Sequence, residues 1–259
     1  MIYLNGKIEE ESKILKAIEY GYGLFETIGG KGEKLYFFEE HFNRLKNGIN
    51  RIGLNLKYDI EYLYNIVEDL IMLENIEKDE EFKVKVIVAE DLFYVSLNKI
   101  KLREEKNGIK VGLIKSYFQN ELGFLKSLNY MNNILARKEL KKNSYYEGVF
   151  INRNRHITEG TISNIFFIKE DKIFTPSLDL NILNGIIRSK IIEISKLNNI
   201  KIEEGHYYYD ELLEADSIFF TNSLMKNGLL WVKEIDNKLK QKHEFITKIE
   251  NEYKKILQK

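Results

Sequence analysis

The chain has 259 residues, of which 44% are hydrophobic, so it is long enough for one large domain or two smaller ones with ordinary cores. Its 40 basic and 40 acidic side chains cancel, which argues against nucleic acid or an anionic membrane as partner and favours a small molecule. The absence of cysteine excludes disulfides, thiolate catalysis and cysteine-bound zinc, and the scattered histidines argue against any metal centre (His41, His156, His206 and His243).

The sequence contains no recognisable targeting or membrane segment. It begins MIYLNGKIEE, without the basic and then apolar stretch of a secretory leader. Its longest apolar runs fall far short of the ~20 residues that a membrane helix needs. We therefore expect a soluble, cytoplasmic protein.

The first half of the chain predicts strands with two helices. Two short strands flank an Asn5-Gly6 turn, and strands at 24–28 and 35–38 are joined by the glycine-rich GGKGEK turn. Apolar residues recur at helical spacing over 39–52 and 59–74, where Asp59 is a plausible N-cap. Apolar and basic residues alternate over 82–88 as in a half-buried strand, and further strands are expected at 94–102 and 110–114. This pattern predicts an α+β layer.

The second half predicts a separate α+β domain. Residues 116–123 break the pattern and are interpreted as a linker between domains 1–115 and 124–259. A helix is predicted over 127–140, which places Lys126 at a helix start. Pro176 ends a strand, and Gly185 opens a helix over 186–197. Other strands are expected at 147–152, 162–169, 172–174, 201–204 and 217–221, with a helical turn at 210–215 and a last helix at 243–257.

Three features of the second half suit an anionic, aldehyde-bearing aromatic cofactor. Lys126 has apolar neighbours, and a lysine deprotonated by desolvation or by a nearby cation can condense with a carbonyl group. Glu159 can hold a protonated heteroaromatic nitrogen. Gly185 opens a helix whose free N–H groups suit a phosphate. Taken singly, an ordinary structural role explains each feature better.

A few other residues are weaker candidates. Arg44 lies beside the apolar stripe of its predicted helix, so its guanidinium group can reach inward. Tyr22 and Tyr130 can line a pocket, or simply pack in a core. The donors at the end of the strand at 217–221 suit either an anion or a capped turn (Thr221, Asn222 and Ser223).

Six longer motifs span nearly the whole chain: YGYGLFETI, FFEEHFNRL, KSLNYMNNILARKEL, ITEGTISNIFFI, IFTPSLDLNILNGIIR and ADSIFFTNSL. On these motifs the chain resembles the fold-type-IV pyridoxal-phosphate enzymes, the aminotransferase class IV family. That family comprises branched-chain aminotransferases, D-amino-acid aminotransferases and 4-amino-4-deoxychorismate lyases. The resemblance implies a two-domain α+β fold, pyridoxal 5'-phosphate at the domain interface, and a homodimer.

The resemblance also implies a role for individual residues. Lys126 matches the lysine that carries the cofactor and later removes a proton from the substrate. Glu159 matches the partner of the pyridine nitrogen, and Arg44 matches a phosphate contact. The other implied cofactor contacts are Ile186, Ile187, Thr221, Asn222, Ser163 and Asn164, and the implied substrate contacts are Tyr130, Phe25, Tyr22 and Ser223.

Some positions depart from the family pattern. Tyr22 stands where the lyases usually read G-D-G, and Ile187 replaces the threonine of the common G-I-T-R. The usual proline after N-S-L is missing from KNGLLWV.

The motifs also bear on the reaction. Phe25 lacks the hydroxyl group with which a tyrosine helps to hold the substrate carboxylate in D-amino-acid aminotransferases, and F-E-T-I departs from the F-E-G-I-R of branched-chain enzymes. The motifs therefore predict a 4-amino-4-deoxychorismate lyase, which eliminates pyruvate to give 4-aminobenzoate. An aminotransferase of the same family, for branched-chain or D-amino acids, is the alternative. A ligand-binding relative without catalysis is the third reading.

Overall fold

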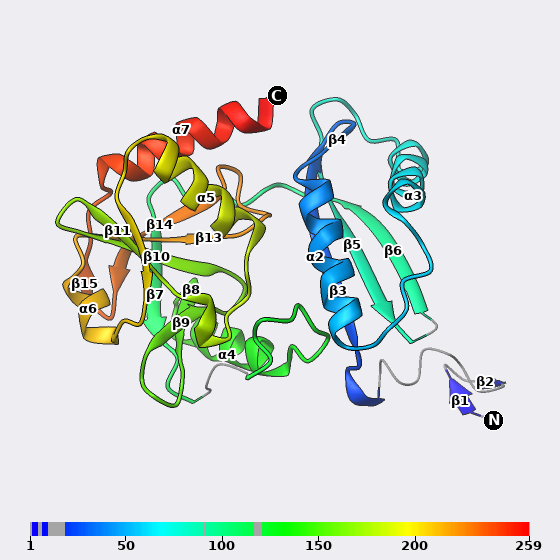
Figure 1. Ribbon diagram of the computed structural model, residues 1–259, viewed down its shortest axis with the longest axis horizontal. Helices are drawn as coiled ribbons and strands as arrows, with labels where there is room; N and C mark the ends of the chain where they lie inside the picture. Colours follow the sequence, from blue (N-terminus) through cyan, green and yellow to red (C-terminus); the bar gives the residue numbers. More distant parts are fainter. Residues whose placement is uncertain (1, 5–6, 10–18, 91, 117–120, 259) are drawn as a thin grey trace. The chain divides into compact units, whose positions relative to one another are not determined.

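The computed structural model describes residues 2–4, 7–9, 19–90, 92–116 and 121–258 (Figure 1). The chain forms two compact units, the first comprising Met1–Lys101 with Leu125–Tyr130 and the second Leu102–Phe124 with Met131–Lys259. This division differs from the predicted domains 1–115 and 124–259. Strand β7 (Ile109–Leu113) lies in the second unit because it pairs with strands of that unit, and 125–130 pair with the first. Residues 117–120 of the predicted linker lie outside the described residues.

The first unit contains a four-stranded antiparallel sheet of order β4-β3-β5-β6. Its strands are β3 (Gly23–Lys31), β4 (Lys34–Leu35), β5 (Glu81–Ala89) and β6 (Leu92–Lys99). The predicted strand at 35–38 is wrong beyond Leu35, because Phe37 adopts a left-handed conformation, with φ 55°, that turns the chain into a helix. A separate hairpin of β1 (Ile2–Leu4) and β2 (Lys7–Glu9) confirms the first two strands, and its Asn5-Gly6 turn lies outside the described residues.

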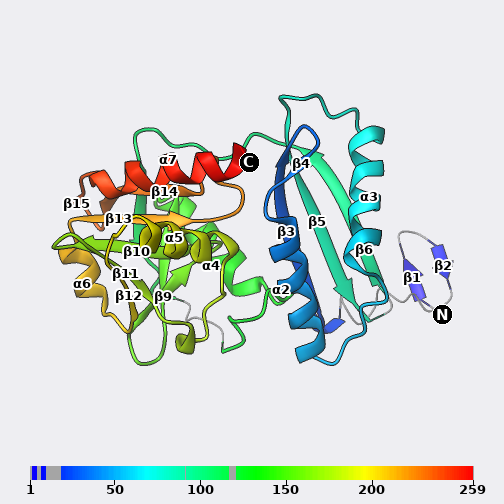
Figure 2. The same ribbon diagram turned by 45° about the horizontal axis from the view of Figure 1, so that its top comes forward.

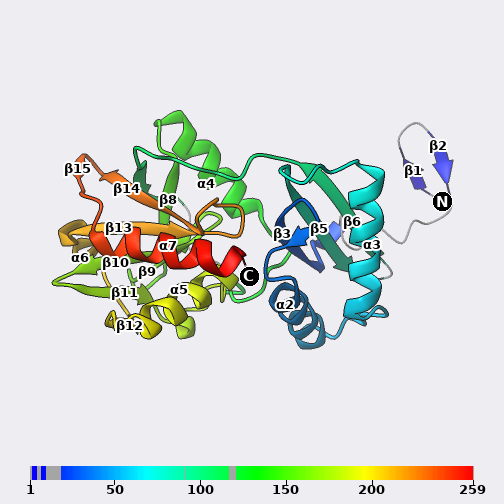
Figure 3. The ribbon, with the colours of Figure 1, turned by 90° about the horizontal axis from the view of Figure 1, so that it is seen from above.

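Helices α2 (Phe38–Arg51) and α3 (Ile60–Leu73) confirm the two predicted helices of the first half, and they lie beside β3 and β6 respectively (Figure 3). Asp59 caps α3 by accepting a hydrogen bond of 2.9 Å from the Tyr62 amide. Both helices cover one face of the sheet, since their buried side chains share a cluster with the inward residues of β3 and β5. Strand side chains alternate between faces, so Phe25, Lys83 and Lys85 lie on the opposite face.

The second unit is built on a nine-stranded mixed sheet of order β12-β11-β10-β13-β14-β7-β8-β9, with β15 paired to β14. β10 and β13 are buried along almost their whole length, so both faces of the sheet are covered at its centre. The prediction missed three strands of this sheet, β9, β14 and β15. The strands besides β7 are β8 (Glu147–Ile151), β9 (Ile157–Gly160), β10 (Asn164–Lys169), β11 (Lys172–Pro176), β12 (Ile202–Gly205), β13 (Ser217–Thr221), β14 (Leu229–Ile235) and β15 (Lys238–Leu239).

The helices of the second unit lie around this sheet (Figure 2). They are α4 (Met131–Lys142), the 3-10 helix η1 (Leu178–Leu180), α5 (Ile186–Leu197), α6 (Tyr209–Glu214) and α7 (Glu244–Gln258). The predicted bounds of α5 and β13 are confirmed to the residue. The predicted start of α4 at 127 is wrong, because 125–128 pair with β3 instead. Among the described residues, no helix has the length and apolar character to cross a bilayer.

Candidate functional site

Lys126 lies on an extended segment beside the first strand of the four-stranded sheet. The Phe25 amide donates to the Lys126 carbonyl over 2.8 Å, and the Leu128 amide donates to the Gly23 carbonyl over 2.9 Å. Ser127 and Leu24 form an antiparallel β-bridge between these two hydrogen bonds. The prediction that Lys126 lies at a helix start is therefore wrong. Pairing with the edge of β3 fixes the position of Lys126 instead.

The ring of Phe25 brings several candidate residues together. Phe25 is buried, and the Nζ atoms of Lys126 and Lys85 lie 4.5 Å and 3.3 Å from its ring centroid. The Tyr130 ring meets it edge-on, with centroids 5.4 Å apart. Burial, and next the charge of Lys126, lower the pKa of Lys85 to about 8. The first unit thus holds two amines and two aromatic rings in one cluster.

A buried charge cluster lies on the other face of β3. Arg44 donates from Nε to Oε1 of Glu26 over 2.7 Å and from Nη2 to Oε2 over 2.8 Å. His41 contacts Oε2 through Nδ1 over 2.7 Å. Burial alone would raise the pKa of Glu26, but the charges and hydrogen bonds of Arg44 and His41 outweigh it and hold that pKa below its ordinary value. Burial lowers the pKa of His41, which its Glu26 contact only partly opposes.

Tyr22 stands apart from the Phe25 cluster. It is partly exposed, and its hydroxyl group donates to the Ile52 carbonyl over 2.5 Å. This bond ties the residue before β3 to the end of α2.

In the second unit, Glu159 lies within the unpredicted strand β9 and not at a turn. It is buried, and its Oε2 accepts hydrogen bonds from the Leu183 amide over 3.1 Å and from Asn164 Nδ2 over 3.4 Å. Asn164 also donates to the Leu183 carbonyl over 2.8 Å. A Cβ atom at Gly185 would lie only 2.0 Å from Asn164 Oδ1. The predicted residues Glu159, Asn164 and Gly185 are thus brought together.

The start of α5 adds uncommitted donors to this group. The Ser189 amide makes the first intrahelical bond, to the Gly185 carbonyl, so the Ile186 and Ile187 amides precede that ladder, and no side chain caps the helix. Thr221 pairs with Asn164 across β13 and β10. Its Oγ1 atom is buried and has no hydrogen-bond partner in the described part of the chain.

The other predicted contact residues of the second unit are Asn222, Ser163 and Ser223. The side chains of Asn222 and Ser163 make hydrogen bonds that fix the loops around them. Asn222 Nδ2 donates to the Ile162 carbonyl, and its Oδ1 accepts from the Leu224 amide over 2.8 Å. Ser163 donates to Glu147 Oε2 over 2.9 Å. Ser223 is partly buried after β13.

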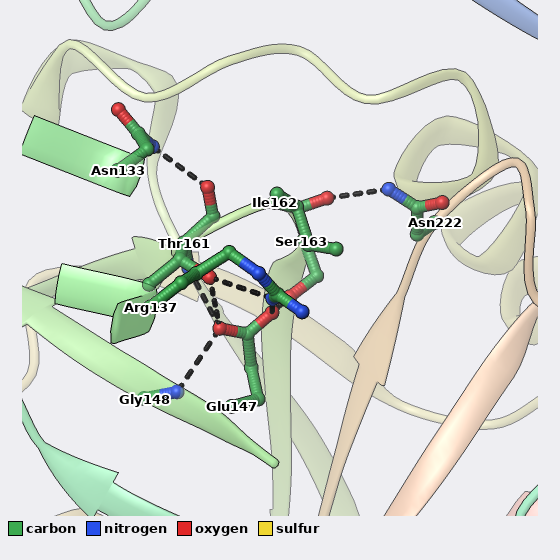
Figure 4. Close-up of polar contacts among 8 residues, drawn as sticks. All are labelled: Asn133, Arg137, Glu147, Gly148, Thr161, Ile162, Ser163 and Asn222. Atoms are coloured by element: carbon green, nitrogen blue, oxygen red, sulfur yellow. Dashed lines mark hydrogen bonds and ion pairs between the residues drawn. The ribbon is translucent and has the colours of Figure 1, made fainter. Parts of the chain in front are cut away.

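Glu147 is the centre of a buried network that sequence reasoning missed (Figure 4). Only 1% exposed, it accepts from the amides of Gly148 and Thr161, each over 3.0 Å, and from the Thr161 hydroxyl group. Arg137 Nη1 donates to Thr161 Oγ1 over 3.0 Å and lies 3.6 Å from Oε2 of Glu147. The network fixes the turn that joins the strand of Glu159 to the strand that begins at Asn164.

The described residues contain no cluster of three or more metal-ligating His, Asp or Glu side chains. The arrangement instead offers amines, buried carboxylates and donors for an anion.

Comparison with known proteins gives the family of the chain. The model of amino-transferase class IV matches residues 23–235. The chain belongs to the aminotransferase class IV family. Members of this family are pyridoxal-phosphate-dependent enzymes.

Relatives of known name agree with this assignment. The chain is 30% identical to aminodeoxychorismate lyase of Bacillus subtilis over 248 residues, which cover 87% of the chain and 84% of the relative. It is 26% identical to D-alanine aminotransferase of Bacillus licheniformis over 245 residues, covering 86% and 84%.

Two solved structures show the fold. A candidate 4-amino-4-deoxychorismate lyase from Legionella pneumophila superposes with a TM-score of 0.85 at 23% identity, covering 97% of each chain. A branched-chain aminotransferase from Thermoproteus uzoniensis superposes with a TM-score of 0.84 at 23% identity, covering 98% of this chain and 93% of that one. The predicted family and fold class are thereby confirmed.

Proposed function

We propose that this enzyme binds pyridoxal 5'-phosphate and acts as a 4-amino-4-deoxychorismate lyase. The observation that carries the reaction is the 30% identity to the lyase of Bacillus subtilis along most of both chains. The phenylalanine at position 25 supports it, because a ring without a hydroxyl group cannot hold a substrate carboxylate as the tyrosine of D-amino-acid aminotransferases does.

The residues present fit the cofactor. The buried, unpartnered Oγ1 of Thr221 is a donor without an acceptor in the described part of the chain, and phosphate oxygens are acceptors. Asn164 connects Thr221 with the start of α5, where the amides of Ile186 and Ile187 suit the same phosphate. The buried carboxylate of Glu159 suits a protonated ring nitrogen.

In this proposal, which follows the family resemblance, Lys126 and Glu159 would hold the cofactor. Lys126 Nζ would bind the aldehyde carbon, and Glu159 would hold the proton on the ring nitrogen. When bound, the cofactor supplies an electron sink for the charge left on a deprotonated substrate carbon. Lys126, once freed by the amino substrate, would accept on Nζ the proton that the substrate carbon loses. Arg44 is a further proposed phosphate contact, on the family resemblance; its Nε and Nη2 atoms donate to Glu26.

Elimination of pyruvate needs no further reactant. The carbon–oxygen bond to the enolpyruvyl group breaks, the ring carbon that bears the amino group loses one proton, and the methylene of the departing group gains one. The amine remains on the ring, so the products balance the substrate. Lys126 is the proposed base for the proton that the ring carbon loses.

Attachment of the cofactor can be measured directly. The purified full chain should be yellow, and reduction with borohydride should fix a pyridoxyl group of the expected mass on Lys126. Lys126→Ala should abolish both signals, whereas the matched control Lys115→Ala, at an exposed lysine outside the site, should keep them. A colourless protein that cannot be reconstituted with pyridoxal phosphate would contradict the proposal.

An aminotransferase is the second candidate, because the D-alanine aminotransferases are 26% identical over a similar length. The two reactions differ in their need for a keto acid. A lyase makes 4-aminobenzoate and pyruvate through many turnovers of 4-amino-4-deoxychorismate without added keto acid. An aminotransferase stops after one turnover unless a keto acid restores the cofactor, so stalling of this kind would replace the lyase proposal.

We also propose a homodimer, on the family resemblance. Light scattering on the eluting protein should give twice the chain mass of 30.7 kDa. A mass of one chain at micromolar concentration would refute it.

A further inference from the structure

Two lysine amines of the first unit share one aromatic ring. Nζ of Lys85 lies 3.3 Å from the centroid of Phe25, and Nζ of Lys126 lies 4.5 Å from the same point. Lys85 is on β5 and Lys126 on the segment paired with β3, so two different backbone pairings hold the amines in place. Since both distances run to the same point, the two nitrogens lie within about 8 Å of each other, close enough for their charges to interact.

The surroundings of the two amines favour one protonated amine over two. The face of an aromatic ring attracts a cation, which stabilises a single charge there. Phe25 is only 7% exposed, so little water screens a second charge beside the ring. Two ammonium groups repel each other at this separation, and the pair therefore releases its first proton at a lower pH than an isolated lysine does.

The other charged groups do not cancel this repulsion. Burial and the charge of Lys126 lower the pKa of Lys85 to about 8, Glu26 opposes that change, and Lys83 adds to it. The Glu26 carboxylate is itself compensated by two hydrogen bonds from Arg44. The charged groups near the two amines are Lys83, on the same face of the sheet, and Glu26, His41 and Arg44, which lie on its other face; the Tyr130 ring contacts the Phe25 ring.

We propose that Lys85 is a positioning residue whose ammonium group, while it carries its charge, favours the unprotonated, nucleophilic form of the Lys126 amine. The inference rests on the proposed function, in which Lys126 binds the aldehyde. In that step the lone pair of a neutral Nζ forms the bond to the aldehyde carbon, and the aldehyde oxygen leaves as water with the two amine protons. Lys85 takes no part in the bond changes; it sets the fraction of Lys126 that can begin them.

The protonation of Lys126 can be measured without enzyme activity. The full chain, freed of cofactor, is labelled with a trace of acetic anhydride between pH 6 and 10, and mass spectrometry follows the Lys126 peptide. In Lys85→Gln and Lys85→Met the midpoint of Lys126 labelling should rise by about one pH unit or more. Lys85→Arg keeps the charge and should keep the midpoint. Lys83→Gln, on the same strand and face but away from the Phe25 ring, is the matched control and should have a much smaller effect.

A second readout is the rate at which the same cofactor-free chains combine with pyridoxal phosphate. One pH unit corresponds to a tenfold change in unprotonated amine, so Lys85→Gln should react about tenfold more slowly at pH 7 and recover at pH 9. Circular dichroism confirms that each variant is folded, and Lys85→Met replaces Lys85→Gln if the latter is not.

The outcomes separate this inference from the proposed function. An unchanged labelling midpoint in both neutral variants overturns the role of Lys85, even if Lys126→Ala still abolishes the borohydride-fixed adduct. Retention of that adduct in Lys126→Ala overturns the proposed attachment site, whatever the Lys85 variants show.

Discussion

The carboxylate of Glu147 should be a principal stabilising group of the second unit, although it is not a predicted contact of cofactor or substrate. It is 1% exposed and accepts hydrogen bonds from Gly148, Thr161 and Ser163, with Arg137 as its partial counter-charge. Removing a buried acceptor leaves donors unpaired at about 1–3 kcal/mol, and breaking a buried charge pair costs about 3–5 kcal/mol.

Two substitutions of Glu147 separate these contributions. Glu147→Ala removes every acceptor and should lower the free energy of unfolding by about 3–5 kcal/mol. Glu147→Gln keeps one oxygen for the Gly148 and Thr161 amides, but turns an amide N–H group toward Arg137 and the Ser163 hydroxyl, so about 1–3 kcal/mol is expected. The control Glu214→Gln removes an exposed pair, 3.0 Å from Lys169, and should cost less than about 1 kcal/mol.

Tryptophan fluorescence gives a readout confined to the affected unit. Trp231 is the only tryptophan of the chain and lies on β14 of the second unit. Urea unfolding of the cofactor-free full chain, followed at this residue, gives the midpoint and slope for each variant. If Glu147→Ala unfolds within about 0.5 kcal/mol of Glu214→Gln, the buried network does not stabilise the unit and the reasoning fails.

Three further predictions concern the candidate site and the charge cluster beside it. Thr221→Val should change the free energy of unfolding by less than about 1 kcal/mol, since Oγ1 has no partner in the described residues, yet weaken pyridoxal-phosphate binding about tenfold; equal affinity by calorimetry would contradict this. Gly185→Ala places a Cβ atom 2.0 Å from Asn164 Oδ1, so that side chain must shift, at a cost of about 1–3 kcal/mol, and retention of the cofactor during dialysis should fall. Arg44 and His41 hold the pKa of Glu26 below its ordinary value, so its stabilisation is present above the unfolded pKa of about 4.3 and is lost as pH falls further. Glu26→Gln should therefore flatten the fall of the urea midpoint below about pH 4, and an equally steep fall in the variant would refute the assignment.

Local sequence patterns correctly predicted those helices and strands that can be recognised from their own residues, without knowledge of the elements they pack against. Gly185 begins α5 and the apolar SIFFT forms β13 as expected, because a cap and an apolar run are visible in sequence. The buried carboxylates Glu26 and Glu147 were missed, since their counter-charges come from other elements. The available signal was a glutamate within or beside an apolar strand, as in L-F-E-T-I and E-G-V-F-I, where an unpaired charge could not be buried.

The position of Lys126 shows most clearly what a local pattern cannot contain. The segment that follows it has helical spacing, and α4 does begin at Met131; nothing within 125–128 indicates that these residues instead pair with β3. That choice depends on the free edge of a strand about a hundred residues earlier, whose Phe25 amide needs an acceptor. This pairing also affects the chemistry of Lys126. The amide of Phe25 donates to the Lys126 carbonyl, and the ring of the same residue lies beside the amines of Lys85 and Lys126. Substitution of Phe25 should therefore alter the reactivity of Lys126 as well as the recognition of the substrate.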